Sequence, residues 1–245
     1  LGEQLARANR IDAVWFYREH STAIIDPPPV ALVISETLGN LAYEENIIET
    51  LTDARRFLAP GGVILPRRIE QFCAPVTGTR LYEELSAWDG VGYGLDFSLA
   101  KTVTLNNLYV RRITEADLLG GIGGARRWDA VDLGRRTRSL RRGSGSWRIS
   151  RAKRVHGFAL WWRCELVPGV ALSTAPDAPE THWEQIFAPV LEPIDVRRGE
   201  TLELAIVSDT RNPGALVRWE ARVRDGDTLR LRQSLDLRKG DPEDG

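Results

Sequence analysis

Methionine is absent from the 245-residue sequence, cysteine occurs only twice, and no long apolar run is present. Cys73 and Cys164 are too few and too far apart to form a disulfide framework or a metal site. The apolar runs stay well below the about 18 residues that indicate a membrane span, and no charged and apolar leader opens the chain. We therefore expect no metal, no membrane partner and a reduced, cytoplasmic setting. Because position 1 is Leu1, the chain is expected to be processed or to be a piece of a longer protein.

The chain also lacks an excess of positive or negative charge, because 33 Lys and Arg residues balance 34 Asp and Glu residues. No global field therefore attracts the chain to nucleic acid or to a membrane. The sequence contains no Walker motif, no Gly-x-Ser-x-Gly and no His-Glu-x-x-His, so hydrolase and zinc chemistry lack support. The length allows one large domain or two smaller ones with a sizeable core.

The first 65 residues alternate between helical and strand patterns. Helical spacing covers residues 1–10, a strand is predicted at Ile11–Tyr17, and a buried strand is predicted at Ala31–Ile34. An amphipathic helix is predicted over Tyr43–Leu58, and Pro60, Gly61 and Gly62 are expected to end it before a short strand at 63–65. This alternation predicts part of a parallel-sheet α/β domain. We place the domain boundary at Pro66, giving domains 1–65 and 66–245.

Beyond Pro66 the pattern becomes mostly β, after a helical stretch at Leu81–Trp88 and a glycine-rich bend at Gly90–Gly94. Turn-forming pairs such as Pro168-Gly169 and Asp225-Gly226 separate the later candidate strands. Many short strands at such intervals indicate a sandwich or a barrel. The candidate strands are Glu70–Val76, Val103–Val110, Trp147–Ala152, Phe158–Leu166, His182–Phe187, Thr201–Ser208, Val217–Val223 and Leu229–Leu235.

Acidic residues gather directly after the predicted strand at 31–34. Ser35, Glu36 and Gly39 form a polar loop, and Glu44 and Glu45 follow it. Ligands of open α/β sheets bind at the carboxyl ends of strands, so these carboxylates are expected to face a cleft. Two converging carboxylates suit a planar guanidinium, which offers a fork of hydrogen-bond donors. In the alternative interpretation, the acidic residues cap the following helix or remain solvated.

Two further stretches have a functional and a structural interpretation. Residues 126–154 carry eleven Lys or Arg against Asp129 and Asp132, which favours solvated strand faces over binding of nucleic acid or an acidic partner. The loop 175–183 ends in His182 and Trp183, where the imidazole could be a buried structural group held by a carboxylate or a proton carrier. The glycine clusters 90–94 and 120–124 are predicted to be loops.

Three segments, taken in order, resemble the protein arginine methyltransferase family. Ser35-Glu36-x-x-Gly39 with Glu45 nine residues after Glu36 resembles the double-Glu loop of that family. Residues 58–66, Leu-Ala-Pro-Gly-Gly-Val-Ile-Leu-Pro, are similar to its helix end and crossing into a barrel domain. Residues 156–162 followed by 172–176 and by Thr181-His182-Trp183 resemble its Thr-His-Trp loop region. The set spans most of positions 5 to 235.

The resemblance implies the C-terminal half of a doubly wound Rossmann-like methyltransferase domain, followed by a β-barrel domain with a helical dimerisation arm at about 81–112. It implies S-adenosylmethionine-dependent methyl transfer to a guanidine nitrogen of a protein or peptide arginine, in a homodimer. Glu36 and Glu45 would clamp the guanidinium, His182 would be the third catalytic residue, and Trp183 would line the acceptor side. Glu36 would also touch the cofactor, whose remaining binding residues would lie upstream of Leu1.

The sequence departs from the family pattern inside the acidic loop. Thr37 and Leu38 stand where the family usually has Trp and Met, and Glu44 competes with Glu45 for the second clamp position. Two alternatives therefore stay open. One is an inactive paralogue or dimeric binding module whose basic region holds an acidic partner, and the other is a methyltransferase for a small guanidino compound. The segment by itself is expected to be inactive, because the family builds its cofactor site mainly from residues before Leu1.

Overall fold

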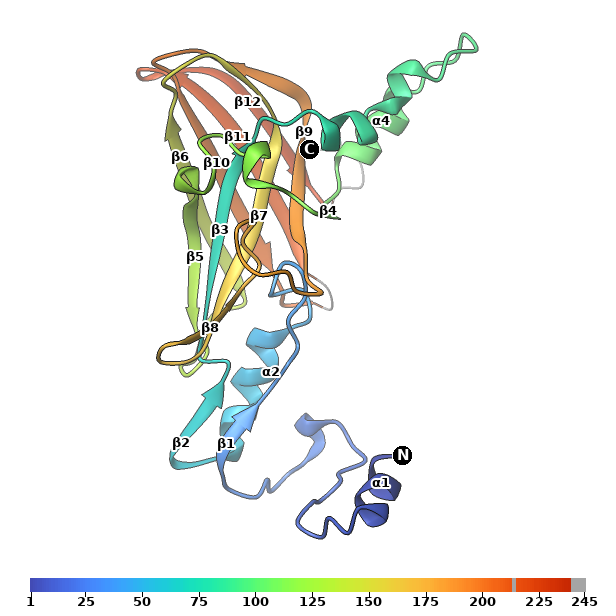
Figure 1. The fold of residues 1–245 in the computed structure, drawn as a ribbon, viewed down its shortest axis with the longest axis vertical. Helices are drawn as coiled ribbons and strands as arrows, with labels where there is room; N and C mark the ends of the chain where they lie inside the picture. Colours follow the sequence, from blue (N-terminus) through green and yellow to red (C-terminus); the bar gives the residue numbers. More distant parts are fainter. Residues whose placement is uncertain (213–214, 239–245) are drawn as a thin grey trace.

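The computed structural model describes residues 1–212 and 215–238, which form a small α/β unit below a large β-barrel-like body (Figure 1). In the α/β unit, β1 (Val30–Ile34) and β2 (Leu58–Leu65) pair in parallel. The connection between them carries α2 (Ile47–Ala54) and the 3-10 helix η2 (Arg55–Phe57). Parallel strands require such a crossover, because the carboxyl end of the first strand and the amino end of the second lie at opposite edges of the sheet.

Helix α2 forms because its apolar residues repeat at helical spacing. Ile47, Ile48 and Leu51 lie on one face and are all buried. The helix is shorter than the predicted span, since it begins at Ile47 and the chain tightens into η2 after Ala54. The predicted stop at Pro60 is wrong, because Pro60 lies inside β2, where an irregularity in the β1–β2 register accommodates the Pro-Gly-Gly sequence.

The predicted strand at Ile11–Tyr17 is absent from the structure. This segment follows α1 (Gly2–Ala8) as an irregular chain that reaches η1 (Ser21–Ala23) without pairing to another described strand. Trp15 is 79% exposed, although its residue type favours a strand. β-propensity describes how well a side chain fits a half-buried pleated surface, and this segment has no such surface beside it.

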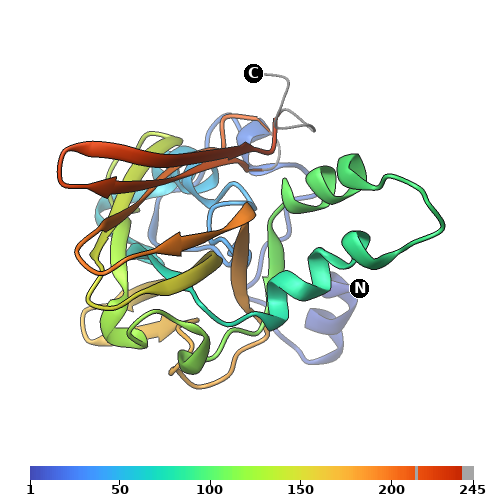
Figure 2. The same cartoon turned by 90° about the horizontal axis from the view of Figure 1, so that it is seen from above.

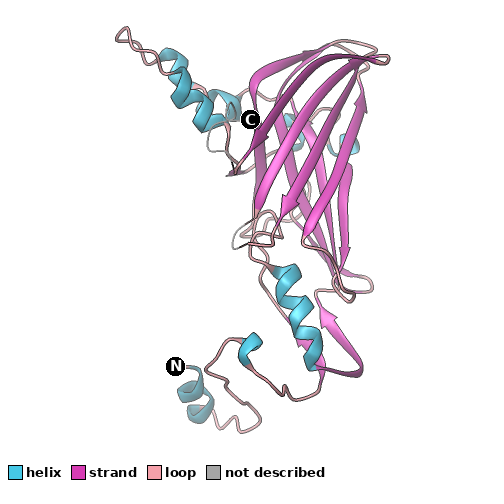
Figure 3. Ribbon diagram, turned by 180° about the vertical axis from the view of Figure 1, so that it is seen from behind, coloured by secondary structure: helices cyan, strands magenta, loops and turns pink. Residues whose placement is uncertain are grey.

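Two antiparallel sheets build the body (Figure 3). One has the order β12-β11-β10-β6, and the other has the order β4-β9-β7-β3-β5, with β8 paired to β7. The sheets approach each other between β5 and β6, where a Cβ atom on Gly143 would overlap the backbone carbonyl of Trp128. The strands are β3 (Arg68–Val76), β4 (Tyr109–Arg111), β5 (Arg126–Asp132), β6 (Leu140–Arg148), β7 (Lys153–Val167), β8 (Val170–Ser173), β9 (Gln185–Val196), β10 (Thr201–Asp209), β11 (Leu216–Asp225) and β12 (Thr228–Asp236).

Alternation of apolar and polar residues places the core between these two sheets. Along β10, Leu202, Leu204 and Ile206 are buried while the residues between them are half-buried. This pattern is typical of antiparallel strands with one solvated face. Strands β7 and β9 are longer than predicted, and their central residues are buried over a continuous stretch. Short 3-10 turns, η4 (Glu115–Asp117) and η5 (Ile122–Gly124), connect β4 to β5.

Residues 80–105 project from the body as a helical hairpin, which we call the arm (Figures 1 and 2). It consists of α3 (Arg80–Leu85), η3 (Ala87–Gly90) and α4 (Ser98–Leu105). The predicted strand at Val103–Val110 is wrong, since its first residues end α4 and β4 begins only at Tyr109. Trp88 stacks on Phe97 at 5.8 Å between ring centroids and so packs η3 against the chain that enters α4. In residues 1–212 and 215–238, no helix is long and apolar enough to span a membrane.

Candidate functional site

The acidic loop, residues 35–46, joins β1 to α2 and is bound to the end of the barrel-like body. The backbone N–H of Ser35 donates to Leu65 O at 3.0 Å, which continues the β1–β2 pairing into the loop. Further along, Trp162 Nε1 donates to Gly39 O at 3.1 Å, and the Gln71 side chain donates to the carbonyl of Leu41. Trp162 and Gln71 are fully buried. The barrel therefore fixes the path of a loop that local sequence alone leaves free.

Glu44 closes the acidic loop on itself. Its two carboxylate oxygens accept the backbone N–H groups of Asn40 at 2.6 Å and Leu41 at 2.8 Å. Burial raises the pKa of Glu44, although these two hydrogen bonds favour its charged form. The carboxylate also occupies the space that a Cβ atom on Gly39 would need, which explains glycine at that position. Glu44 is thus held by the backbone of its own loop.

Glu36 and Glu45, in contrast, are exposed. Glu36 Oε1 accepts one long hydrogen bond, from Leu38 N at 3.4 Å. Within the described ranges, Glu45 makes no hydrogen bond or ion pair through its carboxylate. The helix-capping alternative is wrong for these carboxylates, because the N-cap of α2 is Asn46 and no side chain bonds to the first turn there. Both carboxylates are available to a ligand.

The predicted Thr-His-Trp loop lies against the acidic loop. Trp183 Nε1 donates to Leu38 O at 2.6 Å, and Glu184 N donates to Asn40 Oδ1 at 2.8 Å. Trp183 also packs edge-on against Trp162, with 5.2 Å between ring centroids. The structure therefore brings together two segments that lie more than 130 residues apart in the sequence.

His182 is exposed, so the interpretation of a buried imidazole is wrong. Its ring contacts that of Trp183 in a tilted arrangement, with 3.7 Å between the ring centroids and 37° between the ring planes. The expected bond to a carboxylate is absent from the part of the chain that the structure describes. His182 is thus an exposed imidazole directly before Trp183, which bonds to the acidic loop.

A buried polar network that sequence reasoning missed also anchors the acidic loop. Tyr43 donates its hydroxyl proton to Asp129 Oδ2 at 2.9 Å, and Arg141 Nε donates to the same oxygen at 2.8 Å. Burial raises the pKa of Tyr43 well above its usual value, so the phenol stays protonated and continues to donate. Tyr43 and Asp129 are 86 positions apart, and no sequence pattern signals their contact.

Among residues 1–212 and 215–238, the structure contains no group of three or more His, Cys, Asp or Glu side chains that could hold a metal ion. Cys73 and Cys164 are buried and free. Burial raises the pKa of each thiol to about 12, which keeps both uncharged and unreactive at neutral pH. The candidate site therefore consists of carboxylates, an imidazole and indole rings.

Comparison with known proteins identifies a family whose sequence pattern covers most of this chain. The pattern of the arginine methyltransferase oligomerization subdomain matches residues 68–217. Protein arginine N-methyltransferase 6 of Xenopus laevis is 32% identical over 186 residues, covering 70% of this chain and 54% of that protein. Probable protein arginine N-methyltransferase 6.1 of rice, Oryza sativa subsp. japonica, is 26% identical over 239 residues, covering 82% of this chain and 60% of that protein. The chain thus spans little more than half the length of these relatives.

Solved structures share the fold at low sequence identity. The PRMT1 enzyme–prozyme heterotetrameric complex with AdoHcy from Trypanosoma brucei superposes with a TM-score of 0.75 at 15% identity, over 96% of this chain and 78% of that chain. Protein arginine methyltransferase 10 of Arabidopsis thaliana gives a TM-score of 0.71 at 18% identity, with the same coverage. These likenesses support an arginine methyltransferase-like fold with a barrel-like domain. Together with the match over residues 68–217, they place this chain in the protein arginine methyltransferase family.

Proposed function

We propose that the protein carrying this chain transfers a methyl group from S-adenosylmethionine to a guanidine nitrogen of arginine in a protein or peptide. The observation that carries the proposal is the pair of exposed carboxylates, Glu36 and Glu45, on a loop that the barrel-like body fixes. Glu36 accepts only one long hydrogen bond and Glu45 none in the described residues, and a guanidinium complements such a pair of carboxylates.

In this proposal Glu36 and Glu45 accept hydrogen bonds from the substrate guanidinium and hold its plane fixed. Their charges stabilise the guanidinium and leave one nitrogen pointing away from the clamp. Orientation of that nitrogen supplies a large part of the rate enhancement, because a fixed encounter geometry replaces random collision. Glu44 is excluded from the clamp in this account, because the N–H groups of Asn40 and Leu41 already occupy its oxygens.

Methylation of a guanidinium releases one proton, which must go to an acceptor. We assign this role to a ring nitrogen of His182, which is exposed beside Trp183 at the same edge of the barrel. Trp183 is assigned to the acceptor side of the site, where its indole can pack against the substrate side chain. The hydrogen bond from Trp183 Nε1 to Leu38 O holds the indole ring against the acidic loop.

The cofactor fits this chain at one place. Glu36 lies at the carboxyl end of β1, where ligands of parallel sheets bind, and its carboxylate is exposed there. When bound, S-adenosylmethionine supplies an electrophilic methyl group on a sulfonium. We propose that the α/β unit, residues 1–65, is the second half of the Rossmann-like cofactor domain and that the larger share of the cofactor site comes from residues beyond this segment.

We further propose that the protein works as a homodimer joined through the arm. Tyr93, Leu95 and Leu99 are strongly exposed apolar side chains on the arm, which lies inside the region that matches the oligomerization subdomain. The heterotetrameric relative from Trypanosoma brucei is an assembly of chains with this fold. A cytoplasmic location stays a prediction.

The test is methyl transfer from isotope-labelled S-adenosylmethionine to an arginine peptide by the full-length protein, with a lysine-for-arginine peptide as the matched control. Label in the arginine peptide alone is the expected result. Calorimetric titration of S-adenosylmethionine into the 245-residue chain runs beside it, and we expect no binding there. Cofactor binding by the full-length protein without transfer to any guanidine would overturn the enzyme proposal in favour of the dimeric binding module.

A further inference from the structure

A second polar site lies between α2 and the barrel-like body, and its lining includes no residue of the acidic loop. It is a cleft of about 910 Å³ between three separate elements. Glu49, Asp53 and Arg55 of α2 and η2 form one wall, residues 136–140 between β5 and β6 form the second, and Arg211 after β10 forms the third. The volume is within the range of pockets that hold small molecules.

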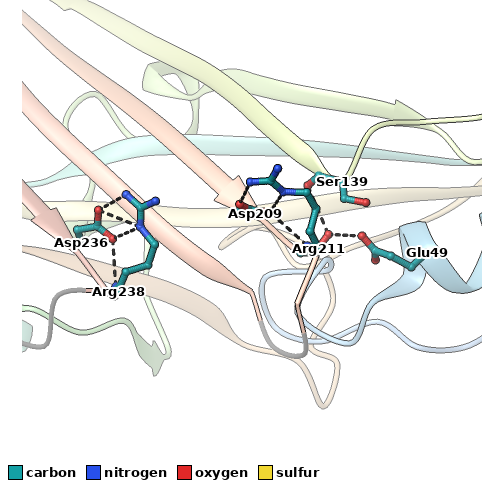
Figure 4. A network of polar contacts seen from close by, with 7 residues as sticks. Glu49, Ser139, Asp209, Arg211, Asp236 and Arg238 are labelled. Atoms are coloured by element: carbon teal, nitrogen blue, oxygen red, sulfur yellow. Dashed lines mark hydrogen bonds and ion pairs between the residues drawn. The ribbon is translucent and has the colours of Figure 1, made fainter.

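Hydrogen bonds between the walls hold this cleft in shape (Figure 4). The Arg55 guanidinium donates to Leu133 O and Gly134 O, at 2.7 Å in each case. The Thr210 hydroxyl donates to Glu49 Oε1 at 2.6 Å, which joins the end of β10 to α2. Asp209 fixes Arg211 through contacts of 2.8 and 2.6 Å. The guanidinium groups of Arg55 and Arg211 are therefore held in place before a ligand binds.

Positive charge in the cleft is not balanced by its own acids. Four arginines, Arg55, Arg136, Arg138 and Arg211, face two carboxylates. Glu49 accepts one hydrogen bond from Thr210, and Asp53 pairs with Arg56 at 3.1 Å, while the second oxygen of each carboxylate is buried without a partner in the described residues. The cleft thus presents a net positive surface.

Three of the four arginines lack a carboxylate partner in residues 1–212 and 215–238. Arg136 and Arg138 are exposed and make no ion pair in those ranges. Arg55 bonds only to carbonyl oxygens, and its buried Nε atom has no acceptor. Burial lowers the pKa of Arg55, because the charged form loses water, and the charge of Asp132 offsets part of that effect.

Within the basic stretch 126–154, some arginines find acids. Arg127 pairs with Glu70, Arg141 with Asp129, and Arg154 with Asp195. Other basic residues of the stretch, Arg126, Arg142, Arg148, Arg151 and Lys153, make no ion pair in the described residues either. What distinguishes Arg136 and Arg138 is that they line one cleft together with Arg55 and Arg211.

We propose that this cleft binds a small phosphate-bearing molecule. Guanidinium groups grip phosphate through paired hydrogen bonds, which makes several convergent arginines a phosphate site. The bound molecule bridges α2 to the loop 136–140 and to Arg211, and so ties the α/β unit to the barrel-like body. The proposal does not depend on methyl transfer, since binding is measured directly on the chain.

The test is isothermal titration of the 245-residue chain with inorganic pyrophosphate, uridine triphosphate and uridine at constant low ionic strength. Pyrophosphate and the triphosphate are expected to bind, and uridine is expected not to bind. Tighter binding of the triphosphate assigns a nucleotide as the occupant, and equal affinity assigns free phosphate. Binding of uridine as tightly as the triphosphate, or binding of no probe, overturns the proposal.

The double variant Arg136→Gln with Arg138→Gln removes two cleft charges and is expected to weaken pyrophosphate binding at least tenfold. The matched control is Arg197→Gln with Arg198→Gln, which removes two exposed charges from the turn at the opposite end of β10. This control is expected to change the affinity less than twofold. Equal weakening by both double variants would show general charge attraction and would also overturn the proposal. Circular dichroism confirms that each variant is folded.

Discussion

At the scale of single residues, the neighbouring carboxylates of Glu44 and Glu45 differ in what surrounds them. Glu44 is half-buried and accepts two backbone N–H groups, whereas Glu45 is exposed. A conservative change to glutamine is therefore expected to affect hydrogen bonding differently at the two positions. At position 44 it places an amide NH₂ against a backbone donor, and at position 45 it changes only a solvated group.

We predict that Glu44→Gln lowers the free energy of unfolding by about 1–3 kcal/mol, because one buried backbone N–H loses its acceptor. Glu45→Gln is the matched control, and it should stay within about 0.5 kcal/mol of the unchanged protein. Chemical denaturation followed by tryptophan fluorescence measures both values. Equal stability of the two variants would contradict the assignment of Glu44 to the interior of the acidic loop.

His156 gives a pH-dependent prediction at the same scale. Its side chain is only 6% exposed, and its Nδ1 atom is buried without a partner in the described residues. Burial lowers the pKa of His156 below its ordinary value of 6.5, and the charge of Arg154 lowers it further. Below pH 6.5 the unfolded chain therefore takes up a proton that the folded chain resists, and the folded state loses stability as the pH falls.

The expected result is a free energy of unfolding that decreases between pH 7.5 and pH 5, by about 1.4 kcal/mol for each unit by which the pKa is lowered. His156→Gln should reduce this slope, whatever its stability at pH 7.5. His20→Gln, a change at an exposed histidine, should leave the slope as it is. An unchanged slope in the His156 variant would show that other groups cause the pH dependence.

At the scale of elements, the sequence was informative where a pattern was local. The strands β1, β3, β7, β10, β11 and β12 follow from apolar runs, alternation and turn residues within a few positions. The strand predicted at Trp147–Ala152 is wrong, because β6 covers Leu140–Arg148, and β5 and β8 were not predicted. The prediction that β1 is buried is also wrong, since Leu32 is 43% and Ile34 69% exposed. The strand predicted at Ile11–Tyr17 failed because strand formation needs a neighbouring strand, which no local pattern supplies. The strand predicted at Val103–Val110 failed because Thr102, Val103 and Thr104 have β-propensity but end the helix α4.

The candidate site was predictable only in part, for the same reason. The sequence motifs identified Glu36, Glu45, His182 and Trp183 as candidates. The contacts that fix the positions of these segments involve residues far away in the sequence. Trp162 reaches Gly39 across 123 positions, and Asp129 reaches Tyr43 across 86. Such contacts depend on the register of the sheets. The proposal of Glu45 rather than Glu44 for the clamp likewise rests on the path of the loop backbone.

The arm is the element on which the proposed dimer depends. Leu99 lies on α4 and is 63% exposed. We predict that Leu99→Glu converts a dimer to a monomer, because a charge buried in an apolar interface loses its water without gaining a partner. Light scattering after size-exclusion chromatography measures the mass. Leu229→Glu places the same charge at an exposed leucine on β12 and should leave the dimer intact.

If both variants keep the mass of the unchanged protein, and that mass is a dimer, then subunits associate through a surface other than the arm. If the unchanged protein is a monomer at micromolar concentration, the proposed homodimer is wrong. Neither outcome bears on the proposed carboxylate clamp, which is assigned to the acidic loop and not to the arm.

At the scale of the whole molecule, the α/β unit and the barrel-like body meet at the acidic loop. The unit supplies Glu36 and Glu45, and the body supplies Trp162, Trp183 and His182. Arg55 makes a further connection through Leu133 O and Gly134 O. The site therefore exists only when both parts are folded and docked, which explains why so many hydrogen bonds cross this junction.

The most direct test of the central claim is the rate of arginine-peptide methylation by full-length Glu36→Gln and Glu45→Gln variants. The account predicts that kcat/KM falls at least 100-fold in each, about 2.7 kcal/mol of lost transition-state stabilisation. Asp227→Asn, at an exposed turn between β11 and β12, should keep the activity of the unchanged protein. Activity within threefold of the unchanged protein in either glutamate variant would contradict the carboxylate clamp.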